Sequence, residues 1–279
     1  MKNRTYIRTS LAALGMVLLI LDSKTVIKSA TEGIEICLNL VIPSLFPFIF
    51  LSNVLTSVMN RSSSLFAIGM LGGYPAGAQT LRTAYDQGNL SRESAQKMLG
   101  YCNLAGPAFI FGMLSPLFAK AYIPWILWGI QITANLIPYF IFRDTKAFKK
   151  LCVNKNIPSV SEILLRSIKS ISLICGWVFL FRILICVLEV RLFNRFSFIY
   201  GALLSGLLEM TNGCCKLYAF PESIRFVLCS GFLGFGGICV LLQTSSIVND
   251  LGIEYYLKGK ILHGILSIFL ALLFEPIIF

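Results

Sequence analysis

The residues best suited to bind a solute lie beside clusters of glycine and proline that interrupt apolar segments. Five neutral side chains near these clusters can donate or accept hydrogen bonds: Gln79, Asn103, Thr211, Asn212 and Gln243. Lys216 is the cation beside a cluster that could meet a carboxylate. The dipeptides Gly106-Pro107 and Gly236-Gly237 each predict a helix N-terminus, where unpaired N–H groups and the helix dipole favour negative charge. Together these residues predict a binding site for a small anion.

The full set of candidate substrate-binding residues adds the glycines and prolines of the clusters and one acid. It comprises Gly73, Tyr74, Pro75, Gly77, Gln79, Asn103, Gly106, Pro107, Glu209, Thr211, Asn212, Gly213, Lys216, Gly234, Gly236, Gly237 and Gln243. A structural role is an open alternative for several of them. The glycines could serve close helix packing, Lys216 could extend to the membrane interface, and Gln243 could bond a neighbouring helix.

Glu209 needs a specific explanation because it lies just inside an apolar segment. A carboxylate there is costly unless it is paired or hydrated. We expect Lys216 or Arg182 to be its partner, with proton coupling through Glu209 as an alternative role.

The sequence has no pattern that is typical of an enzyme or of a metal or cofactor site. His263 is the single histidine, without nearby acidic or cysteine ligands, so we expect it to pack or to hydrogen-bond in the last apolar span. Nucleophile elbows, phosphate-binding loops and paired catalytic carboxylates are absent. The nine cysteines form no CxxC motif and fit the role of small apolar residues, although a redox role for the adjacent pair Cys214-Cys215 stays open.

Composition indicates an integral membrane protein. Hydrophobic residues make up 56% of the chain and charged residues 13%, and the apolar runs exceed what a soluble core helix needs. The formal charge of +11 does not indicate a nucleic-acid partner, because Lys and Arg gather between apolar spans rather than on one basic face. Membrane topology and contact with the lipid bilayer explain the excess better.

Hydropathy predicts four segments in the first half of the chain. The first, residues 7–21, follows basic residues and predicts a retained helix rather than a cleaved signal. The second, residues 34–58, predicts a span with a kink at Pro43 and Pro47. Two further spans are predicted at residues 104–119 and 122–142. Residues 65–71 are too short to cross before the cluster at 72–75, so they predict a re-entrant hairpin, whose exit carries the charged residues between 82 and 97 into solvent.

The second half repeats this order after a basic interval that the positive-inside rule places in the cytoplasm. It contains a span at 168–190, a short segment at 198–208, an interrupted helix at 223–248 and a last span at 257–274. By eye, 41–55 matches 174–188, Gly77 matches Gly213, and Gly106 matches Gly236. We therefore predict an all-α polytopic membrane protein with two inverted-topology repeats, each of three spans and a re-entrant hairpin.

The predicted organisation is an N-terminal transmembrane helix (1–28), a first repeat (29–142), a basic cytoplasmic linker (143–161) and a second repeat (162–279). Counting crossings from a cytoplasmic N-terminus places the C-terminus outside. It also places Lys258 and Lys260 on the cytoplasmic side, as the positive-inside rule expects, whereas Arg191 and Arg195 fall outside and count against this topology.

Four motifs in matching order carry a family resemblance: Gly73-Tyr74-Pro75-Ala76-Gly77-Ala78-Gln79, Cys102-Asn103-Leu104-Ala105-Gly106-Pro107, Glu209-Met210-Thr211-Asn212-Gly213 and Gly234-Phe235-Gly236-Gly237. The chain resembles YlbJ-type sporulation integral membrane proteins of the nucleoside-recognition, or Gate domain, group. The resemblance implies a role in spore formation, movement of a dipicolinate-like anion, and a place in the bacterial cell membrane or outer forespore membrane. Homo-oligomers or other sporulation membrane proteins are partners that it allows.

Two functional classes follow from these observations. The paired interruptions favour a transporter or channel, because transporters build their binding sites from discontinuous helices. A membrane scaffold or accessory protein of spore formation, without transport activity, is the alternative. A metal-ion permease is a weaker third option because acidic ligands are scarce near the interruptions.

Overall fold

The computed structural model describes residues 6, 13, 15–17, 19–58, 62–86, 88–143, 158–192 and 197–279. The regular structure in these ranges is entirely helical, which confirms the all-α prediction. The predicted first helix at 7–21 and the linker at 143–161 lie largely outside the described residues, so the domain boundaries that depend on them stay predictions.

Five helical segments are long and apolar enough to cross a bilayer. They are Ser23–Leu55, Ile123–Phe142, Val160–Arg191, Glu222–Leu251 and Glu254–Ile278. They confirm an integral, multi-pass membrane protein. The first begins well before the predicted position 34, because Ser29 and Thr31 bond their hydroxyls to carbonyls one turn back and so fit inside the helix.

The predicted distortion near Pro43 and Pro47 takes the form of a π-helical turn. Helix α2 (Ser23–Ile36) joins α3 (Ile42–Val58) through the wider turn Cys37–Val41, called η1. Proline lacks an N–H group and crowds the preceding turn, so the regular α-helical bonding cannot continue unchanged towards these residues. The helix therefore widens where a kink was predicted.

Each half contains a packed pair of short helices where a hairpin was predicted. In the first half α4 (Ser62–Gly72) and α5 (Ala76–Asp86) pack together around the break at Gly73 to Pro75. In the second half α9 (Phe198–Leu208) and α10 (Met210–Lys216) pack together around Glu209.

Each hairpin is followed by an interrupted helix. The second is the predicted one: α11 (Glu222–Phe235) and α12 (Gly237–Val248) meet at Gly236, whose φ of 85° is a conformation that glycine adopts readily. The first corrects a prediction. Residues 104–119 are not a complete span, because the helical part there, η2 (Ala108–Leu114) with η3 (Ser115–Leu117), is preceded by α6 (Arg92–Cys102) across a non-helical stretch at 103–106.

Helix α6 belongs to the packed protein although its charges suggested a solvent-exposed exit segment. Arg92 and Glu93 are exposed, but Met98, Leu99 and Cys102 are buried. Ser91 caps the helix by accepting a hydrogen bond from the backbone N–H of Ser94, at 3.1 Å. One polar side and one buried side are what an amphipathic helix at the edge of a bundle needs.

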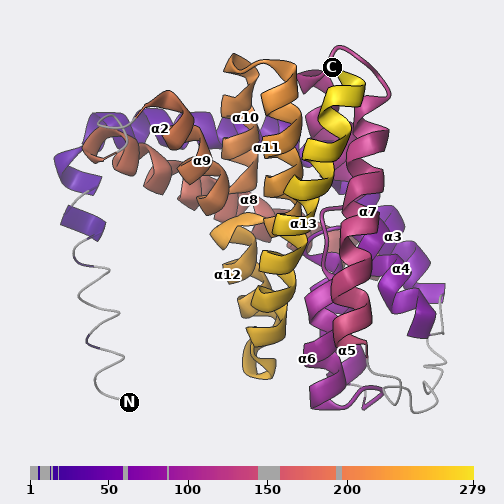
Figure 1. Ribbon diagram of the computed structural model, residues 1–279. Helices are drawn as coiled ribbons and strands as arrows, with labels where there is room; N and C mark the ends of the chain where they lie inside the picture. Colours follow the sequence, from indigo (N-terminus) through magenta and orange to yellow (C-terminus); the bar gives the residue numbers. More distant parts are fainter. Residues whose placement is uncertain are drawn as a thin grey trace.

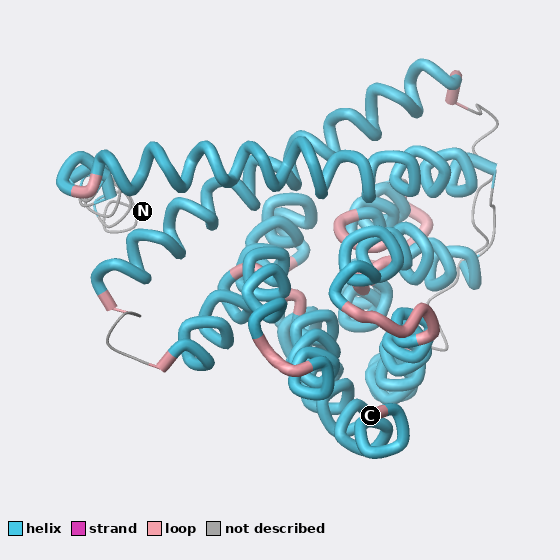
Figure 2. Tube along the Cα trace, turned by 90° about the horizontal axis from the view of Figure 1, so that it is seen from above, coloured by secondary structure: helices cyan, strands magenta, loops and turns pink. Residues whose placement is uncertain are grey.

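The helices form a bundle crossed by two long helices. In Figure 1 α7 (Ile123–Phe142), α11 and α13 (Glu254–Ile278) stand side by side, and Figure 2 shows this group nearly end-on. In Figure 2 the segment α2–η1–α3 and α8 (Val160–Arg191) are seen along their lengths and cross one another. Helix α8 starts at a capping box of Ser159 and Glu162 and runs for 32 residues, about 48 Å at 1.5 Å per residue. That length reaches across a bilayer core even when the helix is strongly tilted.

The order of elements is the same in both halves: a long helix, a hairpin, an interrupted helix and a closing helix. This order agrees with the predicted duplication. The inverted relation of the two halves stays a prediction.

Candidate solute-binding site

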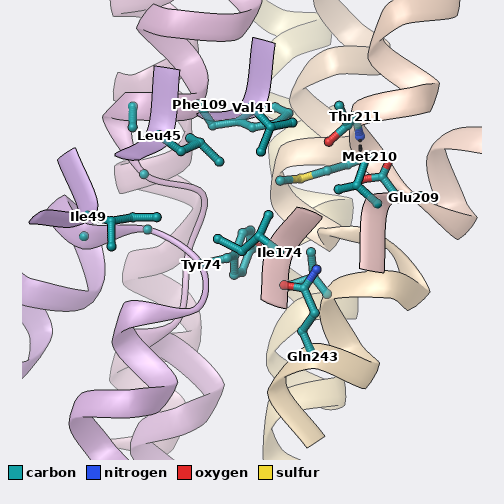
Figure 3. A pocket seen from close by; sticks show the side chains of 16 residues that line it. Val41, Leu45, Ile49, Tyr74, Phe109, Ile174, Glu209, Met210, Thr211 and Gln243 are labelled. Carbon is teal, nitrogen blue, oxygen red and sulfur yellow. Dashed lines mark hydrogen bonds between the residues drawn. The ribbon is translucent and has the colours of Figure 1, made fainter. Parts of the chain in front are cut away.

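The chain breaks of both halves meet at one cavity in the middle of the molecule. Its wall includes Gly73 and Tyr74 from the first hairpin, Gly106 from the first interrupted helix, and Glu209 and Thr211 from the second hairpin. Val240 and Gln243 of α12 complete this part of the wall. Figure 3 shows Glu209, Thr211 and Gln243 on the side of the second half, with the apolar Val41, Leu45 and Ile49 opposite.

The apolar part of the wall comes from equivalent places in the two halves. Val41 and Leu45 lie in the π turn and at the start of α3, and Ile174 and Val178 lie on α8. These are the residues that the alignment of 41–55 with 174–188 pairs, Val41 with Ile174 and Leu45 with Val178. Equivalent positions of the two halves therefore form the apolar wall, whereas the polar groups of the site are concentrated on one side.

Glu209 is buried and serves as the N-terminal cap of α10. Its carboxylate accepts hydrogen bonds from the backbone N–H groups of Thr211 (2.9 Å) and Asn212 (2.7 Å), and from the Asn212 side chain (2.7 Å). The predicted pairing of Glu209 with Lys216 or Arg182 is wrong. Unpaired N–H groups at a helix start stabilise a carboxylate without a counter-ion, so no basic partner is required.

Lys216 and Arg182 belong to a separate ion-pair network. Lys216 pairs with Glu189 and donates to the Ser205 hydroxyl at 2.7 Å. Arg182 pairs with Glu32 and approaches Glu189 at 3.9 Å. Lys216 does not line the cavity, because its side chain points from α10 to α8. Its role as the cation of the site is thus not supported by its position.

The predicted neutral donors divide into two groups. Thr211 and Gln243 line the cavity. Asn103, Asn212 and Gln79 instead make internal contacts: Asn103 bonds Thr244 at 2.9 Å and the backbone N–H of Ala78, Asn212 bonds Glu209, and Gln79 bonds Ser170 on α8 at 3.1 Å. The internal group holds the hairpins against their neighbours.

Most of the candidate glycines mark places where backbones touch. A Cβ on Gly73 would lie 2.9 Å from the Cα of Gly106, and one on Gly213 would lie 2.2 Å from the Cα of Gly206. Gly77 faces the carbonyl of Cys102, Gly234 faces Gly264, and Gly237 faces the carbonyl of Leu208. The structure therefore supports the packing explanation, and Gly73 and Gly106 also line the cavity. Pro75 lies next to α5, and Pro107 has helical dihedral angles at the start of η2, as predicted.

Lys260 is the cation that the sequence-based reasoning missed. It was treated as a cytoplasmic topology marker, but it is buried on α13, with a relative exposure of 1%. Its ammonium group donates to the hydroxyl of Tyr74 and to the carbonyl of Gly234 at 3.3 Å. An available signal was its position inside an apolar span, where an ionisable residue indicates a functional role.

The single histidine and most of the described cysteines are buried. His263 is buried on α13 and its Nε2 lies 3.0 Å from the carbonyl oxygen of Gln131 on α7, so the predicted packing and hydrogen bond are present, with the partner on another helix. The cysteines in the described ranges are free thiols, and Cys214 is buried while Cys215 is exposed. Within the same ranges no group of three side chains is arranged to hold a metal ion.

The cavity is small and mostly apolar. About 40 Å³ of it is open to the centres of water molecules, which is room for a few waters. Typical small-molecule sites measure several hundred Å³. The breaks therefore surround a space that an organic solute does not fit without movement.

Comparison with known proteins gives one informative match. The chain is 24% identical to the sporulation integral membrane protein YlbJ of Bacillus subtilis (strain 168), in an alignment 317 positions long that covers 90% of this chain and 78% of the relative. No family model matches the chain, and no solved structure gives a significant match. The similarity confirms the predicted relation to YlbJ-type proteins, whereas the relation to the Gate domain stays a prediction.

Proposed function

We propose that this chain, an integral membrane relative of the sporulation protein YlbJ, transports a small organic anion of the dipicolinate type through the cavity between its interrupted helices. The convergence of chain breaks from both halves on that cavity carries the proposal. Irregular backbone at membrane depth is stable only against protein or a wet cavity, and transporters place their substrate sites at such points. Resemblance assigns the activity to the bacterial cell membrane or the outer forespore membrane.

The scaffold alternative is less well supported by the site. A protein that only assembles a complex needs no cavity whose wall is shared by two hairpins and two interrupted helices. Transport does need such a wall, because the solute must be reached in turn from both sides of the membrane. Because the cavity is too small for an organic solute, transport requires the hairpins to move against the long helices α3 and α8.

Glu209 acts in this proposal as the cap of α10. Three N–H donors bind its carboxyl group, and these bonds fix the start of the helix. Its hydrogen-bonding capacity is thus directed to α10, and the attraction for an anion must come from another group.

Dipicolinate accumulation in a spore-forming host that lacks its own family member tests the function. We expect this chain to restore accumulation, and Thr211→Val and Gln243→Leu to lower it while the protein still reaches the membrane, because both changes remove polar groups from the cavity wall. Ser246→Ala is the matched control, since Ser246 is exposed on α12 and lies outside the cavity. If all three variants restored accumulation as well as the wild type, the result would favour the scaffold. If a correctly inserted wild-type chain did not restore accumulation, dipicolinate would be removed as the solute.

A further inference from the structure

Lys260 lies directly behind one wall of the cavity. Tyr74 lines the cavity, and the Lys260 Nζ on α13 lies 4.7 Å from the centroid of the Tyr74 ring. Tyr74 therefore touches both the cavity and a buried ammonium group that does not line it.

The ammonium of Lys260 has no acidic partner among the described residues. The ion pairs found there join other side chains, and no described carboxylate oxygen lies within 4.0 Å of its Nζ. It is held instead by the Tyr74 hydroxyl, the Gly234 carbonyl and the negative end of α11, whose last turn is where Gly234 lies. A cation buried without a counter-ion is costly, and it is retained in membrane proteins where function requires it.

Tyr74 is held by contacts with the second half of the chain. Its hydroxyl donates to the Leu233 carbonyl at 3.4 Å and lies against Gly236, where a Cβ would approach it to 2.9 Å. Tyr74 belongs to the break of the first hairpin, whereas Lys260, Leu233 and Gly236 belong to the second half. The contact between Tyr74 and Lys260 thus joins the two halves at the site where they must separate for the cavity to open.

We propose that Lys260 is the carboxylate-binding group of the transport site and that Tyr74 is the movable wall that covers it. A carboxylate of the solute replaces the Tyr74 hydroxyl as the acceptor of the Lys260 ammonium when the Tyr74 ring turns away. The inference rests on the proposed transport function and names its anion-recognition residue. It also explains how a site whose wall carries the carboxylate of Glu209 can accept an anion.

The test is uptake of radiolabelled dipicolinate by proteoliposomes that contain the purified full chain. Lys260→Gln should raise the half-saturation concentration about tenfold or more, because it replaces a charge-assisted hydrogen bond by a neutral one. Lys258→Gln, two residues away on the same helix but exposed, should leave it unchanged. Tyr74→Phe should lower it, since the ammonium then loses the acceptor that competes with the solute.

The outcomes separate this inference from the proposed function. Uptake by the wild type with the same half-saturation concentration in Lys260→Gln would overturn the role of Lys260 and leave transport intact. Absence of uptake by the folded wild type would overturn the proposed function itself. If Lys260→Gln does not fold, Tyr74→Phe decides: a raised or unchanged half-saturation concentration contradicts the competition between Tyr74 and the solute.

Discussion

Two buried charges at the site, Glu209 and Lys260, are stabilised by helix ends rather than by each other. Glu209 caps the start of α10, and Lys260 lies at the end of α11, so each charge meets the end of the dipole that favours it. Sequence-based reasoning identified Glu209 as unusual but assigned the wrong partners. Ion pairs such as Lys216 with Glu189 depend on which turns of distant helices meet, and one sequence does not contain that information.

The capping role of Glu209 predicts a loss of stability on truncation. Glu209→Ala should lower the free energy of unfolding by about 1–2 kcal/mol, because the N–H groups of Thr211 and Asn212 lose their acceptor. Thermal unfolding in detergent measures the change. Glu254→Ala, in the first turn of α13 without a side-chain cap, is the control, and an equal effect of both substitutions would contradict the capping role.

At the level of elements, glycine clusters predicted the breaks at Gly73 and Gly236, whereas the break expected around Thr211 to Lys216 lies at Glu209, because residues 210–216 form α10. The breaks at Gly73 and Gly236 lie where the sequence placed them, because positive φ angles favour glycine. Helix α6 was missed as a packed element because Arg92, Glu93 and Lys97 gave it the composition of a solvent-exposed segment. Its buried side is defined by packing against α13, a contact between segments far apart in the sequence.

The close approach of Gly73 and Gly106 predicts opposite effects of alanine at two glycines. Gly73→Ala should destabilise the protein by about 2 kcal/mol or more, since φ at that residue is 68° and the new methyl group would meet the backbone of Gly106. Gly176→Ala, inside α8 with open space around it, should stabilise by about 0.5–1 kcal/mol. Chemical denaturation in detergent measures the free energy of unfolding of both variants. An unchanged value for Gly73→Ala would refute the close contact between Gly73 and Gly106.

At the scale of the whole molecule, reciprocal contacts support the inverted arrangement of the halves. Arg225, at the start of α11, donates to the carbonyl of Leu117 at the end of the first interrupted helix. Arg92, at the start of α6, donates to the carbonyl of Asp250 just after α12, at 2.5 Å. The start of each interrupted helix thus holds the end of the other, as two antiparallel copies would.

The ends of the bundle give a topology that can be measured. Lys120, before α7, donates to the carbonyl of Ile278 at 2.7 Å, and the ring of Phe142, at the end of α7, lies 5.7 Å from that of Tyr255. The residues near Phe279 and those near Phe142 therefore lie at opposite ends of the bundle. An epitope tag after residue 149 should be protected in intact protoplasts, whereas a tag after Phe279 should be digested by external protease. Equal protection of both tags would contradict the inverted topology.

Hydropathy predicted the order of the helices along the chain but not their directions. Apolar length shows that α8 can span a membrane and says nothing about its crossing over α2–η1–α3 (Figure 2). That crossing is what brings Ile174 and Val178 opposite Val41 and Leu45 around the cavity. The family resemblance predicted the general role of the protein. The position of the site could be found only from the packing of the helices.

The most direct test of the account is dipicolinate uptake by proteoliposomes when the cavity is filled from its apolar side. Val178→Phe adds volume at a buried position on the wall, and Leu180→Phe makes a comparable change on the same helix at a side chain that is 58% exposed. The account predicts saturable uptake by the wild type and by Leu180→Phe, and uptake lowered at least tenfold in a folded Val178→Phe protein. Full uptake by Val178→Phe would contradict transport through this cavity.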